Sequence, residues 1–363
     1  MTLGDATVVV GGYTSNNDGD ARGITGYRVE PTAEAVDMLE LPVLAAESPS
    51  YLVSHPNGRW HYAVGEGDNS ELTLFGVERD ALRRGGSVRT GAAGACHLAL
   101  TTDGTHIVVA HYTDGLVTSH RIGPDGAPGP VLGTHRFTGS GPDPDRQSVP
   151  HAHQVVPFGS EILVVDLGTD RIHRLALDSS GRFSESGHPI PVPAGSGPRH
   201  LVVDSTDRLI VACELSAQVL LLRHDGREWR VRDAVSATTS SRHCQPSAIR
   251  LRGDDVFVAN RGPDTFAVLD LDRDEDSLTL LTEVPVAGRW PRDLVVHEDQ
   301  VWVACERSDA VSVFRDAEEL DEELGGADED IEWLLDFRFA SPSPACVLLV
   351  PRPDPSATPT RDG

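Results

Sequence analysis

The chain contains no lysine, so all 31 basic residues among its 363 residues are arginine. This absence excludes any mechanism that needs a lysine amine, such as Schiff-base catalysis or the lysine of a P-loop. Paired cysteines are missing as well. The five cysteines stand singly, with no C-x-x-C pair that would indicate a zinc or redox centre, and we expect all of them to be reduced.

Long hydrophobic runs and an excess of positive charge are also absent. No apolar run approaches the roughly 18 residues that a membrane-spanning helix needs, and no signal peptide precedes the strand-like run 7–10. We therefore expect a cytoplasmic protein with no membrane partner. The 56 acidic residues give a formal charge of -25, which repels nucleic-acid phosphates, so we expect no nucleic-acid partner.

What the sequence does contain is a repeat with a period of roughly 40 to 50 residues, the period of propeller blades. Each copy reads strand, tight turn, strand, as in 49–66 (PSYLVSHPNGRWHYAVGE) and 96–112 (CHLALTTDGTHIVVAHY). Further copies begin at His151, Pro198, Pro246 and Pro291, and a third β-rich run follows each copy. Evenly spaced strands without long helical segments predict an all-β propeller.

The repeat accounts for six blades, and a seventh blade must close the ring. The N-terminal strand 7–12 and the C-terminal run 343–350 can supply it together, which joins the chain ends and removes a free sheet edge. We therefore predict a seven-bladed β-propeller that forms a single domain over residues 1–350. Ten of the seventeen residues 316–332 are acidic and predict a solvated loop, and the tail 351–363 is predicted to be disordered.

Polar residues recur at two positions of the repeat, the start of the innermost strand and the end of the next strand. These positions lie at the same rim of an antiparallel blade, so we expect the side chains to face one mouth of the axial channel. The residues are Glu66; His97, His111 and Tyr112; His151, His153 and Asp166; Arg199, His200 and Glu214; Arg261; Arg292 and Glu306. Such a composition is typical of a site for a polar, anionic ligand.

Each of these residues also has a purely structural interpretation. A single His or Asp beside a strand end is more often a hydrogen-bonding partner of loop backbone than a catalyst. Glu214 could pair with Arg199 as a structural ion pair, and Glu306 could pair with Arg292 in the same way. Convergence of many such residues at one mouth favours a functional site.

A metal site is the main competing interpretation of His151 and His153, because residues two apart on a strand share a face. The arginine-rich neighbourhood would repel a divalent cation, and no metal is expected. The chain also has no G-x-G-x-x-G between strand and helix and no G-x-S-x-G elbow. We therefore expect no cofactor and no serine-hydrolase triad.

The sequence resembles the lactonase family of seven-bladed propellers almost end to end. The phrases that carry the resemblance are Gly11-Gly12-Tyr13-Thr14, Ser48-Pro49-Ser50-Tyr51, Ala95-Cys96-His97-Leu98, Pro144-Asp145-Arg146-Gln147, Pro150-His151-Ala152-His153, Val165-Asp166-Leu167-Gly168-Thr169-Asp170, Gly197-Pro198-Arg199-His200, Glu214-Leu215-Ser216, Asn260-Arg261-Gly262 and Pro291-Arg292-Asp293. The best-known activity of this family is 6-phosphogluconolactonase. The resemblance implies that four residues act on or hold the substrate: His153, Arg199, Glu214 and Arg261.

These residues lead to a hypothesis of metal-independent lactone hydrolysis. Glu214 or His153 would act as general base on water, and Arg199 with a neighbouring histidine would stabilise the developing alkoxide. The planar guanidinium groups of further arginines would grip the phosphate or carboxylate of a small anionic sugar lactone. The expected substrate-binding residues are His97, Arg146, His151, Asp166, His200, Arg261 and Arg292.

Two alternatives stay open at this point. The same fold and arginines could catalyse ring closure on an unsaturated dicarboxylate, as in a muconate-lactonising enzyme. A non-enzymatic propeller could instead bind an anionic small molecule or a protein, although an interaction platform would favour an apolar exposed face. We expect the protein to be a monomer or a weak homodimer.

Overall fold

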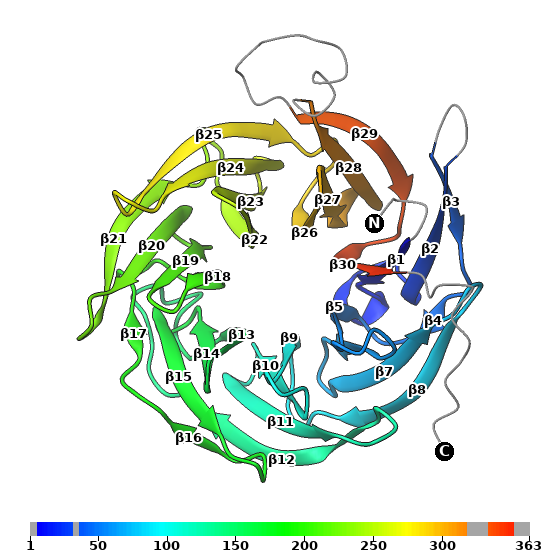
Figure 1. The fold of residues 1–363 in the computed structure, drawn as a ribbon, viewed down its shortest axis with the longest axis horizontal. Coiled ribbons are helices and arrows are strands. Elements are labelled where there is room, and N and C mark those ends of the chain that lie inside the picture. Colours follow the sequence, from blue (N-terminus) through cyan, green and yellow to red (C-terminus); the bar gives the residue numbers. More distant parts are fainter. Residues whose placement is uncertain (1–5, 32–35, 318–332, 352–363) are drawn as a thin grey trace.

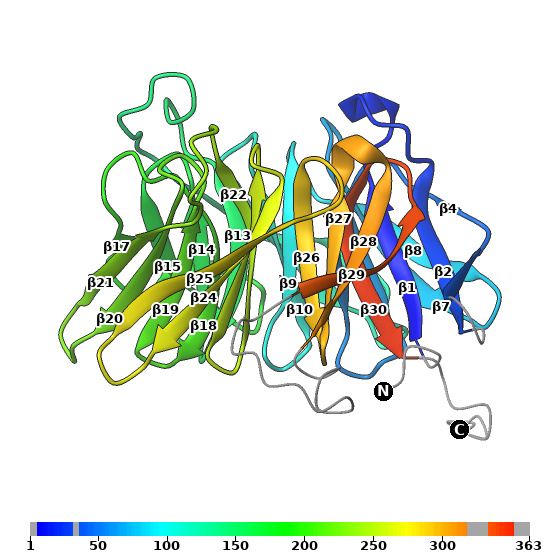
Figure 2. The same cartoon turned by 90° about the horizontal axis from the view of Figure 1, so that it is seen from above.

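A computed structural model describes residues 6–31, 36–317 and 333–351, and it confirms a seven-bladed β-propeller (Figure 1). Antiparallel sheets surround a central axis, and their strands run between the two faces of the ring (Figure 2). Helical structure in the described ranges consists of two short 3₁₀ turns, η2 (Ser15–Asn17) and η3 (Glu306–Ser308). Neither these nor any other described helix is long and apolar enough to cross a membrane.

The blades follow one another along the chain, and within each blade the strands run from the axis outward. Blade 1 comprises β5 (Pro49–Ser54), β6 (His61–Gly65), β7 (Glu71–Val77) and β8 (Leu82–Arg89). Blade 2 comprises β9 (Ala95–Leu100), β10 (His106–His111), β11 (Leu116–Ile122) and β12 (Pro128–Arg136). Blade 3 comprises β13 (Ala152–Phe158), β14 (Glu161–Asp166), β15 (Arg171–Leu177), β16 (Phe183–Glu185) and β17 (Ile190–Pro191).

The other blades repeat this order. Blade 4 comprises β18 (Pro198–Ser205), β19 (Arg208–Cys213), β20 (Gln218–His224) and β21 (Trp229–Ser236). Blade 5 comprises β22 (Gln245–Arg252), β23 (Asp255–Arg261), β24 (Thr265–Asp272) and β25 (Ser277–Pro285). Blade 6 comprises β26 (Pro291–His297), β27 (Gln300–Cys305), β28 (Ala310–Asp316) and β29 (Trp333–Ala340).

Blade 7 joins the two ends of the chain, as the sequence predicts. Its strands are β30 (Pro344–Pro351), β1 (Ala6–Gly12), β2 (Gly23–Pro31), β3 (Val36–Glu40) and the short β4 (Leu44–Ala45). The C-terminal strand β30 lies innermost and pairs with β1 along its length, so neither end leaves an open inner edge.

The predicted tail begins one residue too early, because Pro351 still pairs with Ala6 in β30. The rest of that tail, 352–363, lies outside the described residues. The predicted acidic loop overlaps the end of β28, and its residues 318–332 also lie outside the described ranges.

The hydrophobic core is divided among the contacts between neighbouring blades. Seven clusters of buried apolar side chains each join two adjacent blades. Both faces of a blade are therefore covered, which explains why every residue of the middle strands β10 and β27 is buried. Blade 7 approaches blade 1 so closely that a Cβ atom at Gly11 would lie 2.1 Å from the carbonyl oxygen of Pro49.

Ring closure should depend on the packing of β30, which can be tested at Val347. This side chain is 3% exposed and packs with Val8 and Trp302 across the contact between blades 6 and 7. We predict that Val347→Ala lowers the free energy of unfolding by about 2 kcal/mol, because it removes buried methyl groups and leaves a cavity. Calorimetric unfolding measures this, with Val149→Ala as control, since Val149 is 48% exposed. Equal stability of the two variants would contradict the prediction.

Candidate active site

The innermost strand of every blade carries the same irregularity near its start. In blade 2, Ala95 pairs with His111 and His97 pairs with Ala110, which leaves Cys96 without a residue opposite it. This is a β-bulge, which re-aims the side chain of the extra residue. The bulged residues of the seven blades are Ser50, Cys96, His153, Arg199, Ser247 (with Ala248), Arg292 and Ala345.

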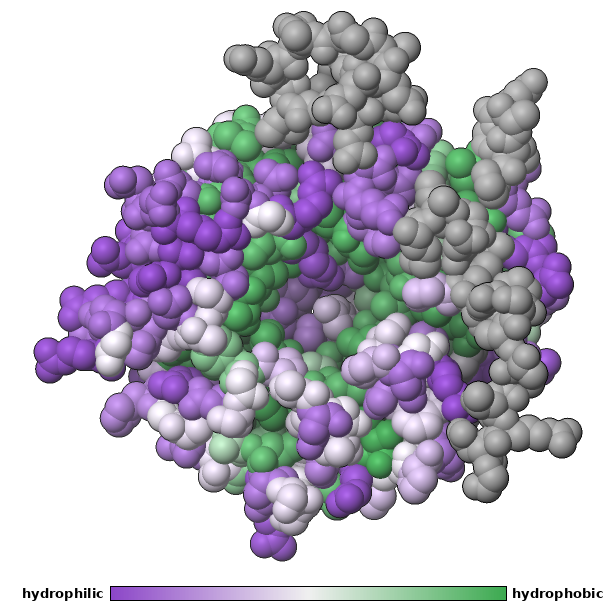
Figure 3. Space-filling view, in the orientation of Figure 1, coloured by the Kyte–Doolittle hydropathy of each residue, from purple (hydrophilic) through white to green (hydrophobic). Residues whose placement is uncertain are grey.

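These bulges build one pocket on the propeller axis. Every bulged residue named above except those of blade 5 lines it, and the other lining residues are Tyr13, Tyr51, Glu66, His200 and Asp293. Figure 3 views the ring from the face where β1 begins, opposite to the pocket, and shows a central hollow with hydrophilic residues at its floor. The pocket holds about 280 Å³ of space free of atoms, including space open to solvent.

A second ring of residues lies at the end of the second strand of each blade, the strand that pairs with the bulged innermost strand. In blade 5 the residue is the last one of that strand, and in the other blades it is the residue directly after the strand. These residues are Tyr13, Glu66, Tyr112, Leu167, Glu214, Arg261 and Glu306. The bulge ring and this second ring meet, because Glu214 and Glu306 contact Arg199 and Arg292 respectively. The site is thus assembled from nearly every blade.

Glu214 is the centre of an arginine cluster. Its Oε1 accepts a hydrogen bond from Arg146 at 2.5 Å, and its Oε2 accepts one from Arg261 at 2.6 Å and lies 3.3 Å from Nε of Arg199. Burial alone would raise the pKa of this carboxyl, but Arg261, Arg199 and Arg146 together hold it well below its usual range. Glu214 is therefore a permanent carboxylate with both oxygens engaged, which suits positioning of arginines better than proton transfer.

Arg146 reaches this cluster from the loop that connects β12 to β13. The neighbouring Gln147 is fully buried and fixes the loop, because its Nε2 donates to the carbonyl of Leu167 and to Asp170. The loop brings the guanidinium of Arg146 to the mouth of the pocket. No strand of the repeat could supply an arginine there. Arg146 also donates to the hydroxyl of Tyr112 at 3.4 Å.

Arg199 carries a buried charge that its neighbours compensate incompletely. Burial lowers the pKa of this guanidinium to about 9, and nearby Arg261 and Arg292 add to the lowering in spite of Glu214. The group still carries its proton at neutral pH. A buried cation in this position is stabilised by an anion or by developing negative charge.

Three histidines lie beside Arg199, and all three are buried. The ring of His200 lies 5.1 Å from that of His153 and 5.5 Å from that of His97. Burial lowers the pKa of each ring well below its ordinary value, and Arg199 adds to the lowering. Nδ1 of His153, Nδ1 of His200 and Nε2 of His97 have no hydrogen-bonding partner in the described structure. These imidazoles are neutral at pH 7 and available to a ligand or water.

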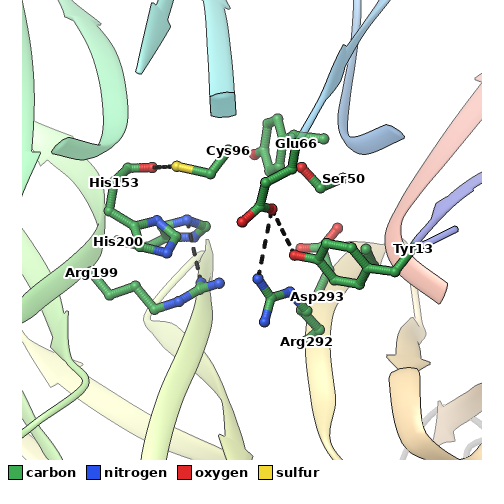
Figure 4. A pocket seen from close by; sticks show the side chains of 11 residues that line it. Tyr13, Ser50, Glu66, Cys96, His153, Arg199, His200, Arg292 and Asp293 are labelled. Carbon is green, nitrogen blue, oxygen red and sulfur yellow. Dashed lines mark hydrogen bonds and ion pairs between the residues drawn. The ribbon is translucent and has the colours of Figure 1, made fainter. Parts of the chain in front are cut away.

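The opposite wall of the pocket is built from Tyr13, Glu66 and Arg292 (Figure 4). The hydroxyl of Tyr13 donates to Oε2 of Glu66 at 2.7 Å. Arg292 lies over the Tyr13 ring at 4.7 Å, between Oε2 of Glu66 at 3.9 Å and Oε2 of Glu306 at 3.6 Å. In Figure 4, the carboxylate of Glu66 projects from this wall toward the side formed by His153, His200 and Arg199.

The structure brings together most of the site residues that the sequence singles out. His153, Arg199, His200 and Arg292 line the pocket, whereas Arg146, Glu214 and Arg261 adjoin it in the arginine cluster. His97 lies beside the pocket, against His200 and Tyr51. His151 stacks on the ring of Tyr112 at 4.3 Å, next to Arg146.

Asp166 does not take part in this group, contrary to the expectation that it binds substrate. Its fully buried carboxylate accepts hydrogen bonds from the backbone of His151 and Gly168 and from the side chain of Thr169, and it contacts His173. It is the last residue of β14, one position before the second ring, so its side chain points to the other face of the strand. His111 has the same position in blade 2 and bonds Thr118 instead of facing the pocket.

Sequence reasoning misses part of the lining, namely Tyr13, Ser50, Tyr51, Cys96 and Asp293. A signal was present, because Ser50 and Cys96 occupy the repeat position of His153 and Arg199. Serine and cysteine by themselves do not indicate catalysis or binding. The pattern of strand residues in the sequence also does not show where the extra residue of a bulge lies. Among the residues with described placement, no three His, Cys, Asp or Glu side chains are grouped so as to hold a metal ion.

The sequence matches the family described as "Lactonase, 7-bladed beta-propeller" over residues 7–332. The chain belongs to this lactonase family. Among curated proteins it is similar to the 6-phosphogluconolactonase of Bacillus subtilis, with 29% identity over 300 residues that cover 79% of this chain and 83% of the relative.

Solved structures described as lactonases resemble nearly the whole chain. A proposed 6-phosphogluconolactonase from Bacteroides fragilis superimposes with a TM-score of 0.83 at 27% identity, covering 96% of this chain and 98% of that one. The periplasmic gluconolactonase of Pseudomonas aeruginosa gives a TM-score of 0.82 at 25% identity, covering 96% and 99%. Because this relative is described as periplasmic, a cytoplasmic location for the present lactonase-family member stays a prediction.

The buried arginine cluster predicts a large stability effect at Glu214. Glu214→Gln removes the charge that compensates Arg199 and Arg261, and we expect it to lower the free energy of unfolding by about 3 to 5 kcal/mol. Glu161→Gln is the matched control, because Glu161 makes a bidentate contact with Arg174 closer to solvent and should cost about 1 kcal/mol or less. Urea unfolding at pH 7 measures both.

The same comparison has a defined pH dependence. A carboxyl whose pKa is lower in the folded than in the unfolded state stabilises the fold above the unfolded pKa of about 4.5, and this contribution is lost as the pH falls toward the folded pKa. The stability gap between the wild type and Glu214→Gln should therefore narrow below about pH 4.5. A gap that is absent at pH 7, or that widens in acid, would contradict the role given to Glu214.

Proposed function

We propose that this protein hydrolyses a sugar lactone, with 6-phosphogluconolactone as the substrate and 6-phosphogluconate as the product. Membership of the lactonase family and the named relatives support the reaction class. The observation that carries the proposal most is the buried, incompletely compensated Arg199 beside the unpartnered imidazole of His153 in one pocket. A neutral base next to a fixed cation is what attack of water on an ester carbon requires.

His153 is the general base in this proposal. Its ring lines the pocket, is neutral at pH 7 and is not committed to another side chain, whereas both oxygens of Glu214 are held by arginines. His153 accepts a proton from water as the water oxygen bonds to the carbonyl carbon of the lactone. The imidazolium that forms lies near Glu214, whose negative charge favours it.

Arg199 faces the charge that develops in this step. The carbonyl oxygen becomes an oxyanion, which the buried guanidinium stabilises without reorganisation of solvent. Nη1 of Arg199 lies 3.3 Å from Nε2 of His200, which steers the guanidinium toward the pocket. When the intermediate collapses, the bond to the ring oxygen breaks, and the proton held by His153 passes to that oxygen to give the open-chain acid.

The arginines around Glu214 provide the place for the anionic group of the substrate. Arg146 has 33% of its side chain exposed and is the member of the cluster most accessible from the mouth. Arg261 is buried and bonded to the carbonyl of Gln245, so it serves as a fixed part of the wall. A guanidinium fork suits phosphate because it binds two oxygens at once.

Replacement of the base gives a direct test. We predict that His153→Ala lowers kcat for 6-phosphogluconolactone by roughly a hundredfold or more, with a much smaller change in KM, because general-base assistance is lost. The rate is measured as acid release above the spontaneous hydrolysis of the lactone. His188→Ala is the control, since His188 is exposed in the loop before β17. Unchanged kcat in the His153 variant, or lactone formation from a muconate in place of hydrolysis, would overturn the proposal.

The pH profile tests the same assignment independently. Burial and Arg199 hold the pKa of His153 well below 6.5, and the base works only when unprotonated. Thus kcat/KM should rise with pH through that lowered pKa and stay level from about pH 6.5 to 8. Unphosphorylated gluconolactone is the substrate of choice, because a phosphate monoester itself titrates near pH 6. An acid limb centred at or above pH 6.5 is incompatible with His153 as the base.

A further inference from the structure

The pocket has two electrically different halves, and the proposed chemistry uses only one of them. The side of Arg199 and Glu214 collects three guanidinium groups, those of Arg199, Arg146 and Arg261, around one carboxylate. The side of Tyr13 places two carboxylates, Glu66 and Glu306, around the single guanidinium of Arg292. An anionic group entering the pocket is attracted by the first half and repelled by Glu66.

Glu66 is held in one orientation but keeps an oxygen free. Its backbone nitrogen donates to the carbonyl of Ser48, and its carbonyl accepts from the side chain of Asn17, so the turn after β6 is fixed. Both side-chain contacts, with Tyr13 and with Arg292, use Oε2. Oε1 makes no hydrogen bond to any residue in the described ranges, and Figure 4 shows the carboxylate reaching into the pocket.

Two further polar groups in this half are uncommitted. Ser50 is the bulged residue of blade 1, only 6% exposed, and its Oγ has no hydrogen-bonding partner in the described structure. Arg292 is held by the Tyr13 ring and by ion pairs longer than 3.5 Å, and its N–H groups form no hydrogen bond to a described side chain or carbonyl. Buried polar groups without partners are costly unless a ligand or water satisfies them.

We propose that Glu66, Ser50 and Arg292 form a hydroxyl-binding subsite that recognises the secondary hydroxyl groups of the lactone ring. A hydroxyl can donate to Oε1 of Glu66 and accept from Arg292 or Ser50 at the same time, whereas an anion or a cation satisfies only one of these. Tyr13 is a positioning residue, because it holds Oε2 and leaves Oε1 for the substrate. The inference rests on the proposed function and adds an orientation: hydroxyls toward Glu66, the anionic end toward Arg146.

The test compares a lactone that has hydroxyl groups with one that lacks them. We expect Glu66→Gln to lower kcat/KM for gluconolactone by roughly 10- to 100-fold while kcat/KM for δ-valerolactone stays the same. Tyr13→Phe should shift the ratio of the two kcat/KM values in the same direction by a smaller factor. An equal loss on both lactones, or no loss on either, would overturn the subsite.

Glu306→Gln is the matched control for charge. It also removes one carboxylate beside Arg292, but Glu306 does not line the pocket, so any effect should act on both lactones alike. A selective loss on gluconolactone in Glu306→Gln equal to that in Glu66→Gln would show that the charge around Arg292, rather than Glu66, makes the distinction.

A binding measurement separates this inference from the proposed activity. Gluconate should raise the melting temperature of the wild type and do so much less in Glu66→Gln, whereas inorganic phosphate should protect both proteins. If the wild type hydrolyses neither 6-phosphogluconolactone nor gluconolactone, the proposed function fails, and the gluconate shift still decides the subsite. Equal protection by gluconate in both proteins, or none in the wild type, would overturn it.

Discussion

The bulge at the start of each innermost strand is the constraint on which the site depends. In a regular antiparallel pair of strands, side chains would point alternately toward the two neighbouring blades. The side chains on both faces would then be buried in the apolar cores between the blades. One extra residue without a partner is free of that alternation and is turned toward the axis. All seven blades carry this bulge, and in every blade except blade 5 the bulged residue lines one small pocket, so residues far apart in sequence meet there.

Burial of so many arginines is tolerated because their charges are shared with a few carboxylates. Glu214 alone is bonded to or paired with three guanidinium groups, and its own pKa is held low as a consequence. The compensation is incomplete at Arg199, whose pKa is lowered to about 9. In a solvated setting this imbalance would disappear by screening. In the buried cluster it remains, and it supports the proposal that the site takes a negatively charged group.

The sequence reveals the propeller because period, strand length and turn residues all repeat, and it reveals the rim because antiparallel pairing fixes which strand ends meet. The sequence does not place a side chain to within one residue, and an error of one residue puts the side chain on the wrong face of the strand. Asp166 and Glu214 both stand at the end of a second strand, yet one is the last paired residue and the other follows it, so they face opposite sides. Nothing in their local sequence distinguishes a loop-capping aspartate from a pocket-lining glutamate. Arg146 could be found only by resemblance, since it lies on a connection that the repeat does not contain.

The residue chemistry of the two pocket halves also explains why one fold can serve different lactones. The bulge and second-ring positions are fixed by strand register, and those that line the pocket belong to none of the seven apolar clusters, so core packing does not decide which polar side chain occupies them. Replacement at Ser50, Glu66 or Arg146 would therefore change what the pocket recognises while the blades stay as they are. The proposed base and oxyanion partner, His153 and Arg199, lie in adjacent blades on bulges of the same kind, so substitutions at the other positions would leave them in place. Family membership accordingly shows the scaffold, whereas the substrate of this chain has to be argued from the individual residues around the pocket.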